Sequence, residues 1–332
     1  MWGVLMTKRV CSVSIDIDTL ACYAGIHGLA PTPTGPMPSD APADAIYTHA
    51  MPRFLDMFAQ YGIRATLFVI GRDIGQSKHA DILKRAVDEG HELANHSYNH
   101  SYRLTQMSES GISLEVSQGA EAIESLLPQG EKVRGFRCPG YNTTPSVLKV
   151  LREQGYRYDS SVFPCPPYYL AKATIIGMLA LRGRPSRSIV GSPQVLLSPN
   201  RPYIPGENPH REARGAKNHG HSEALWELPM SVLPGVRLPM IGTSILMYPR
   251  WSLGSFVRGM ARAHSFLNLE LHGIDIMDPR DPGAKPLLRH QPDLRVSLEE
   301  KFDRFHTTFA LLARNHTFLP LVEAVDWIER QS

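Results

Sequence analysis

Two histidines four residues apart make up the stretch of this chain with the clearest chemical meaning. His96 and His100 bracket the segment His-Ser-Tyr-Asn-His, and we expect them to lie on one face of a helical turn. Neutral imidazole is the commonest metal ligand in proteins. Catalytic zinc sites use three protein ligands and leave a fourth position for water, so a third ligand must come from elsewhere in the chain.

Two carboxylates near the N-terminus are the best source of that ligand. Asp16 and Asp18 lie two residues apart at the end of an apolar run that begins at Val10. Alone, a pair of histidines at this spacing is usually two surface residues, and a lone Asp-x-Asp is equally weak. Because both motifs directly follow a predicted buried strand, their combination indicates a site for a divalent ion.

The bulk composition limits the classes of protein that need to be considered. The chain has 332 residues, is 42% hydrophobic and carries a formal net charge of +3. A small charge without a basic run argues against a nucleic-acid partner. The four cysteines (Cys11, Cys22, Cys138 and Cys165) form no Cys-x-x-Cys, which argues against a zinc ribbon or a disulfide scaffold and favours a reducing compartment. The first basic residues follow the short apolar patch at the N-terminus, so we expect no signal peptide and a cytoplasmic location.

Short apolar runs alternate with amphipathic segments along the chain. We expect strands over 10–15, 64–70, 91–95, 133–137, 156–159, 225–229, 266–271 and 317–319, and helices over 46–61, 78–89, 105–127, 145–154, 252–263, 298–312 and 322–328. This order predicts an α/β fold with parallel strands and crossover helices. Side chains that follow such strands gather at the carboxyl face of the sheet, where barrel enzymes place their active sites.

Two segments interrupt the alternation and are interpreted as insertions, at about 20–45 and 163–224. The first is rich in Pro and Gly, and could be either a wall of the active site or a mobile loop. The second contains the apolar stretch 168–181, which is too short to span a bilayer. It could lie in a membrane interface, form a hydrophobic lid, or pack on the barrel as an extra helix. We expect three histidines of this insertion, His210, His219 and His221, to be surface residues.

The motifs together resemble those of a known family. Residues 90–100 (GHELANHSYNH) are similar to the second motif of the polysaccharide deacetylases, the NodB-homology group or carbohydrate esterase family four. Residues 15–18 (IDID) resemble the first motif of the branch in which that motif is Asp-x-Asp. This branch includes peptidoglycan-deacetylase-like and allantoinase-like proteins, and it is similar to the lipid-linked aminoarabinose deformylases. Residues 136–141, 156–161 and 269–275 follow in the family's order. The resemblance implies one domain over 1–332, folded as a distorted (β/α) barrel of seven or eight strands.

The resemblance also implies how the metal and the base are arranged. Asp18, His96 and His100 would hold the ion, which would be Zn²⁺ or another divalent ion such as Co²⁺, Ni²⁺ or Fe²⁺. Asp16 matches the family's general base, and Arg137 matches the arginine that pairs with it and keeps it ionised. The alternative for Asp16 is that it only orients a metal ligand.

Further roles carry over to the later motifs. His272 matches the general acid; its alternatives are a core histidine or an extra metal ligand. Pro139, Gly140 and Tyr141 match the segment that binds substrate. The family's motif is commonly arginine-x-proline-tyrosine, whereas in this chain Gly140 lies between the proline and the tyrosine. The backbone N–H that faces the oxyanion could therefore belong to either Gly140 or Tyr141. Asp159 matches the first part of the fourth motif, and Asp275 could replace the missing aspartate that orients the acid.

These assignments imply a metal-dependent hydrolase that removes an N-acyl group, above all N-acetyl, from a sugar or glycan. The same fold could instead serve a deformylase or an amidohydrolase of cyclic ureides or imides. A catalytically dead carbohydrate-binding protein is the alternative from another class. The apolar stretch 168–181 adds the hypothesis of a lipid-linked substrate and of peripheral membrane contact.

Overall fold

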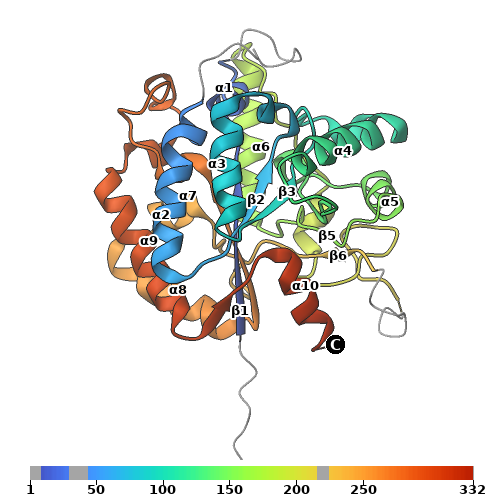
Figure 1. The fold of residues 1–332 in the computed structure, drawn as a ribbon. Helices are drawn as coiled ribbons and strands as arrows, with labels where there is room; N and C mark the ends of the chain where they lie inside the picture. The colour runs from blue at the N-terminus through green and yellow to red at the C-terminus, as the bar shows by residue number, and fades with distance from the viewer. Residues whose placement is uncertain (1–8, 30–43, 215–223, 332) are drawn as a thin grey trace, which may run out of the picture.

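The strands of this protein run parallel in a single curled sheet. The structure is a computed structural model that describes residues 9–29, 44–214 and 224–331. Its strands are β1 (Arg9–Asp16), β2 (Thr66–Val69), β3 (Glu92–Asn95), β4 (Gly135–Phe136), β5 (Tyr158–Asp159), β6 (Trp226–Glu227), β7 (Phe266–His272) and β8 (His316–Phe318). They are ordered β6-β5-β4-β3-β2-β1-β7, with β8 also beside β1 (Figure 1).

The longest strand, β1, fixes the register of the site. It pairs with β7 along its length, so that Asp16 lies opposite His272 at the carboxyl end of both strands. Beyond β6 the chain reaches back to β7, where the Ser231 N–H donates to the Asn268 carbonyl over 3.0 Å. This contact brings the two ends of the strand order together and confirms the distorted barrel.

Helices cover the outside of the sheet, and their ends follow local sequence rules. They are α2 (Met51–Tyr61), α3 (Ser77–Asp88), α4 (Glu109–Glu124), α5 (Pro145–Glu153), α8 (Arg250–Ala263), α9 (Leu298–Ala313) and α10 (Leu321–Glu329). Gly62 ends α2 at a φ of +61°, a conformation that glycine adopts without a steric penalty. Thr144 and Ser297 cap α5 and α9 by accepting hydrogen bonds from the backbone N–H groups of Val147 and Glu300.

Several expectations about the insertions and about the helices need correction. The segment 20–45 was predicted to be one long loop, but α1 (Leu20–Ile26) begins within two residues of Asp18, and residues 30–43 lie outside the described part. The helix α7 (Gly242–Met247) was not predicted. His210 is buried beneath its loop, where its imidazole contacts the Ser198 hydroxyl, so its assignment to the surface was wrong. His219 and His221 lie outside the described residues.

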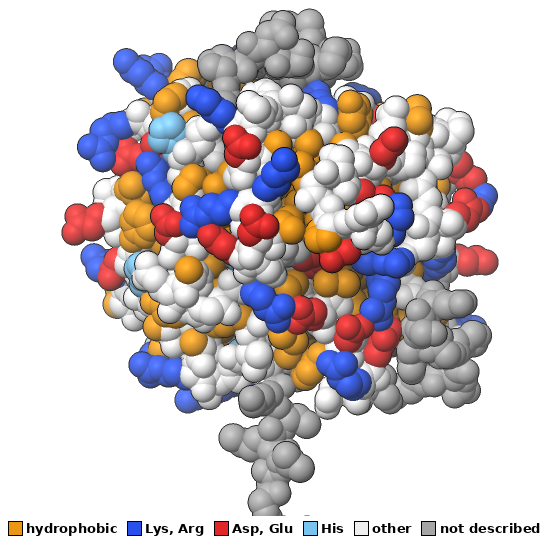
Figure 2. Space-filling model, in the orientation of Figure 1, with side chains coloured by type: hydrophobic (Ala, Val, Ile, Leu, Met, Phe, Trp, Pro, Cys, Tyr) orange, Lys and Arg blue, Asp and Glu red, His pale blue; other side chains and the backbone are white. Residues whose placement is uncertain are grey.

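The apolar stretch forms a helix of its own, α6 (Pro166–Leu181), and none of its residues is fully buried. It stands at the end of the sheet toward which β1 points (Figure 1). Within the described ranges, no helix combines the length and apolar character needed to cross a membrane. On the face shown in Figure 2, acidic and basic side chains alternate over the surface, and the described residues there form no continuous basic area.

Candidate active site

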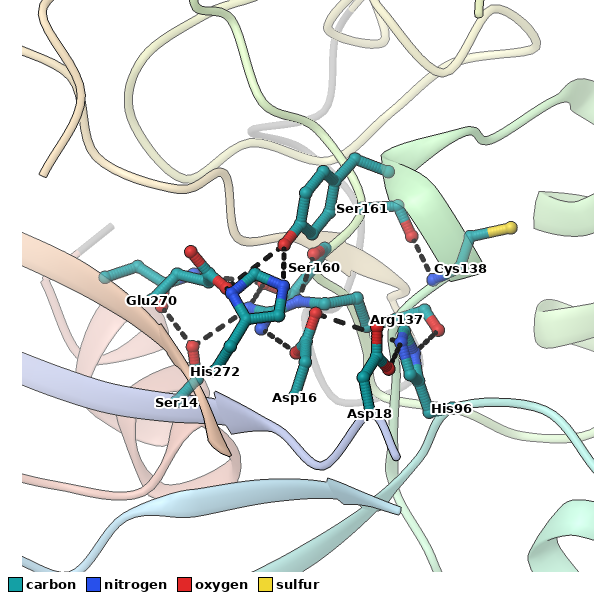
Figure 3. A network of polar contacts seen from close by, with 12 residues as sticks. Ser14, Asp16, Asp18, His96, Arg137, Cys138, Ser160, Ser161, Glu270 and His272 are labelled. Carbon is teal, nitrogen blue, oxygen red and sulfur yellow. Dashed lines mark hydrogen bonds and ion pairs between the residues drawn. The ribbon is translucent and has the colours of Figure 1, made fainter. Parts of the chain in front are cut away.

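Four strands deliver the polar side chains of the site to one end of the barrel. Asp16 and His272 are the last residues of β1 and β7, while His96 and Arg137 directly follow β3 and β4. All four, together with Asp18, point toward a common centre in Figure 3. The carboxyl ends of parallel strands lie at the same edge of a sheet, and this places residues that are up to 256 positions apart side by side.

The three predicted metal ligands converge on a small buried volume. His100 Nε2 lies 3.0 Å from Asp18 Oδ1, His96 Nε2 lies 3.5 Å from the same oxygen, and the two imidazole nitrogens are 3.2 Å apart. No well-directed hydrogen bond reaches Asp18 Oδ1 within the described residues. One carboxylate and two imidazoles that face each other in this way fit a divalent ion such as zinc.

The charges of Asp18 and His100 agree with that fit. Burial by itself would raise the pKa of Asp18, but His100 and His96 hold the pKa well below its ordinary value. Burial lowers the pKa of His100, while Asp16 and Asp18 raise the pKa of His96 against the same effect. An ionised carboxylate beside a neutral His100 is the form in which these groups bind metal.

The segment that carries both histidines is a loop and not the predicted helical turn. Ser97 and His100 have φ angles of +64° and +53°, in the left-handed region that side chains rarely adopt. The His100 N–H donates to Ser97 Oγ over 3.0 Å, which stabilises the bend. His96 Nδ1 donates to the Arg137 carbonyl over 2.7 Å and so turns Nε2 toward Asp18. The imidazoles meet because of this loop and not because of helical spacing.

A cysteine that was not predicted to belong to the site lies beside the ligands. The sulfur of Cys22 and the ligand atoms of Asp18 and His100 all lie within 4.8 Å of one another. Cys22 belongs to α1, four residues after Asp18, and also contacts the Thr19 hydroxyl. Cys22 is not part of a Cys-x-x-Cys pattern. The spacing Asp-x-x-x-Cys, with the aspartate just before the start of a helix, would have been a usable signal.

Asp16 and Arg137 form a fully buried ion pair. Arg137 Nη1 lies 2.5 Å from Asp16 Oδ1, and the guanidinium stacks 4.0 Å from the centre of the Phe68 ring. The remaining N–H groups of Arg137 donate to Ser14 Oγ and to the hydroxyl and carbonyl of Ser160. Asp16 raises the pKa of Arg137 although burial opposes the charge. The arginine is thus locked in place, and it holds one oxygen of Asp16 while the other faces His96 at 3.8 Å.

His272 pairs with a carboxylate that sequence reasoning missed. Its Nδ1 lies 2.8 Å from Glu270 Oε1, and its Nε2 lies 3.0 Å from the Tyr141 hydroxyl, which also donates to Glu270. Burial lowers the pKa of His272, but the carboxylate of Glu270 outweighs it and raises that pKa well above its ordinary value. Asp275, the predicted orienting residue, instead accepts the backbone N–H of His272 over 2.7 Å. Residues two apart on a strand share a face, so the spacing Glu-x-His was the available signal.

The Pro139–Gly140–Tyr141 turn borders the same centre. Gly140 and Tyr141 have φ angles of +67° and +61°, and the Tyr141 N–H already donates to the Cys138 carbonyl over 3.0 Å. Of the two predicted oxyanion donors, this favours the N–H of Gly140. Beneath the turn, Ser161 Oγ accepts the Cys138 N–H and in turn donates to Asp159, so the fourth-motif aspartate supports this turn.

A cavity of about 290 Å³ joins these groups. Its lining includes Asp16, Asp18, His96 and His272. It is also lined by five residues of α6, all but Lys172 apolar or aromatic: Tyr168, Ala171, Lys172, Ile175 and Ile176. The insertion at 163–224 therefore forms part of the site and does not only pack on the outside of the barrel.

Comparisons with known proteins show which family this chain resembles. Residues 42–158 match the model of the polysaccharide deacetylase family. A chitin deacetylase of Arthroderma benhamiae is 31% identical over 114 residues, which is 34% of this chain and 30% of the relative. A peptidoglycan-N-acetylglucosamine deacetylase of Bacillus cereus is also 31% identical over 114 residues, 34% of this chain and 49% of the relative.

A longer match is to the peptidoglycan deacetylase of Helicobacter pylori, 27% identical over 172 residues, covering 50% of this chain and 54% of the relative. The chain thus spans 30% to 54% of the length of these curated relatives. Among solved structures, a putative polysaccharide deacetylase from Mycobacterium smegmatis aligns over 100% of this chain and 93% of that one, with a TM-score of 0.56 and 16% identity. That similarity shows a shared fold.

Proposed function

We propose that this chain, which carries a polysaccharide deacetylase domain, is a metal-dependent hydrolase that removes an N-acyl group, above all acetyl, from a sugar or glycan. The observation that carries the proposal is the cavity that Asp16, Asp18, His96 and His272 line together. It combines a candidate base, a ligand set and a candidate acid within one buried space. The curated relatives are named as deacetylases of chitin and peptidoglycan, which supports an N-acetyl sugar as substrate.

Each residue of the site would have a separate role in amide hydrolysis. Asp18, His96 and His100 would hold a divalent ion, whose chemistry is to polarise a carbonyl and lower the pKa of water. Asp16 would accept the proton of the attacking water, and its ion pair with Arg137 holds the carboxylate in place. The Gly140 N–H would stabilise the negative charge on the acyl oxygen. His272, charged because of Glu270, would donate a proton to the departing amine.

The direct test measures acetate released from N-acetylglucosamine oligomers by zinc-loaded protein. Formamide and cyclic imide substrates run in parallel, because turnover of these and not of acetylated sugars would identify a deformylase or ureide hydrolase. His96→Ala should lose both bound metal and turnover. If zinc-loaded wild-type protein binds sugars and hydrolyses none of these substrates, it is a carbohydrate-binding protein and the proposed reaction is wrong.

We further propose that this hydrolase works at a membrane surface on a lipid-linked glycan. One side of α6 lines the cavity, while Leu170, Met178 and Leu181 on its other sides are 63%, 45% and 90% exposed. Three arginines follow the helix within six residues: Arg182, Arg184 and Arg187. An apolar helix with cations beside it is typical of segments that lie in the interface of anionic membranes. The four free and buried cysteines support a cytoplasmic location for such contact.

Flotation with anionic lipid vesicles tests the membrane proposal. Wild-type protein should float with the vesicles, and the double variant Met178→Glu/Leu181→Glu should lose most of the bound fraction because charges replace the inserted side chains. Leu114→Glu is the matched control, since Leu114 is 56% exposed on α4. Equal flotation of the α6 double variant and the control variant would contradict the proposal.

A further inference from the structure

A single lysine interrupts the apolar wall that α6 contributes to the cavity. Lys172 is partly buried and lines the cavity between Ala171 and the pair Ile175 and Ile176. Its ammonium donates to the Gly140 carbonyl over 2.8 Å. The lysine therefore touches the turn that borders the reacting centre, and no other hydrogen bond from the described residues reaches its ammonium.

The other charged groups of the cavity already have partners. Asp16 pairs with Arg137 at 2.5 Å, His272 pairs with Glu270 at 2.8 Å, and Asp18 lies against the two imidazoles of the predicted metal site. In the described part of the chain, the only hydrogen bond of the Lys172 ammonium is to the neutral Gly140 carbonyl, and it forms no ion pair there. Burial lowers the pKa of Lys172 to about 8, so the ammonium is still largely charged at pH 7. A partly buried cation without a counter-ion costs free energy, which an anion brought by the ligand would recover.

We propose that Lys172 is an anion-binding residue of this cavity, and that the substrate is an N-acyl sugar with a phosphodiester that links it to an apolar chain. This deepens and rests on the function proposed above. Because Lys172 contacts Gly140 and shares the cavity lining with Ile175 and Ile176, an anion bound to it would lie between a sugar beside Gly140 and an apolar group beside these isoleucines. A phosphodiester keeps its negative charge while it is bonded on both sides, whereas a carboxylate becomes neutral once it is esterified. The phosphodiester is therefore the linkage whose chemistry fits this order of groups.

Kinetic discrimination separates anion binding from mere positioning of the turn. The measured quantity is the ratio of kcat/KM for N-acetylglucosamine 1-phosphate to kcat/KM for N-acetylglucosamine. Lys172→Gln keeps an N–H donor for the Gly140 carbonyl but removes the charge, and it should lower this ratio about ten-fold or more, the usual effect of a hydrogen bond to a charged group. Lys172→Arg should retain most of the ratio. Lys132→Gln, an exposed lysine paired with Glu124, is the control and should leave it unchanged.

The outcome that overturns the inference is equally specific. If Lys172 only positions the turn, Lys172→Gln and Lys172→Met will lower kcat for both substrates in parallel and leave the ratio as in the wild-type protein. Such a result would mean that the lysine does not recognise an anion.

Calorimetric binding keeps the test independent of turnover. Zinc-loaded wild-type protein should bind N-acetylglucosamine 1-phosphate more tightly than N-acetylglucosamine, and Lys172→Gln should lose that preference; the variant also excludes the metal as the only phosphate ligand. If the wild-type protein prefers the phosphorylated sugar and Lys172→Gln does not, but no acyl group is released, the reaction proposed above is wrong and the anion site is still supported. A decyl diester of the sugar phosphate should bind more tightly still. Equal or tighter binding of the uridine diphosphate sugar would overturn the assignment of an apolar chain.

Discussion

At the scale of single residues, replacing Asp16 should separate the loss of catalysis from the loss of metal binding. Asp16→Asn is nearly isosteric and leaves the ligand trio intact, so the protein should retain its metal while kcat falls about 10²–10⁴-fold through loss of the general base. Metal content and kcat are measured on the same sample. Because the buried Arg137 would lose part of its partner, thermal unfolding must show that the assayed variant is folded. Unchanged turnover, or loss of the metal, would mean that Asp16 is not the base.

Glu270 is the residue whose replacement should change the pH dependence. His272 can act as an acid only while it is protonated, so kcat should fall as pH rises through its pKa. Glu270 raises that pKa, and Glu270→Gln removes the charge responsible. The alkaline limb of the pH–rate profile should therefore move to lower pH. Asp275→Asn is the control and should move it less, since the Asp275 carboxylate accepts the backbone N–H of His272 and raises the pKa of His272 less than Glu270 does. Identical alkaline limbs in wild type and Glu270→Gln would exclude His272 as the acid.

At the scale of elements, the packing of α4 on β3 explains a glycine that helix propensity alone disfavours. A Cβ on Gly119 would lie 2.4 Å from the side-chain oxygen of Asn95, the residue just before His96. Gly119→Ala should destabilise the fold by about 1–3 kcal/mol through this overlap, measured by denaturant unfolding. Gly177→Ala in α6 is the matched control, because no atom lies within 4 Å of its added Cβ. That change should stabilise its helix by up to about 1 kcal/mol. A Gly119→Ala variant as stable as the wild type would show that β3 and α4 can move apart.

At the scale of the whole molecule, the ligand trio should couple metal binding to global stability. An ion that binds only the folded state stabilises it, by about 2.7 kcal/mol when its concentration is 100 times Kd. A chelator should thus lower the Tm of the zinc-loaded protein by several degrees. The Tm of His100→Ala should respond much less to the same chelator, because the variant lacks one of the three ligands. Scanning calorimetry with and without chelator makes the comparison, and equal Tm values for the loaded and chelated wild-type protein would contradict a buried metal site.

The sequence by itself determined the features that depend on local spacing. Alternating apolar runs predicted the parallel strands and most helices. In the structure, the predicted helices over 145–154, 298–312 and 46–61 adjoin Thr144, Ser297 and Gly62, which cap or end them. Because functional side chains follow parallel strands at their carboxyl ends, the positions of Asp16, His96 and His272 in the chain were enough to predict that they share one face. These inferences succeed because caps, periodicity and strand ends are set by residues that are neighbours in the chain.

Only the tertiary structure decided which distant residues touch. It replaced the expected helical turn at His96–His100 with a left-handed bend, and paired His272 with Glu270 in place of Asp275. It also placed Cys22 beside the ligand trio and brought Lys172, from an insertion, against the turn at Gly140. None of these contacts has a periodic signature, because each depends on where two segments far apart in the chain come to lie once the barrel has closed.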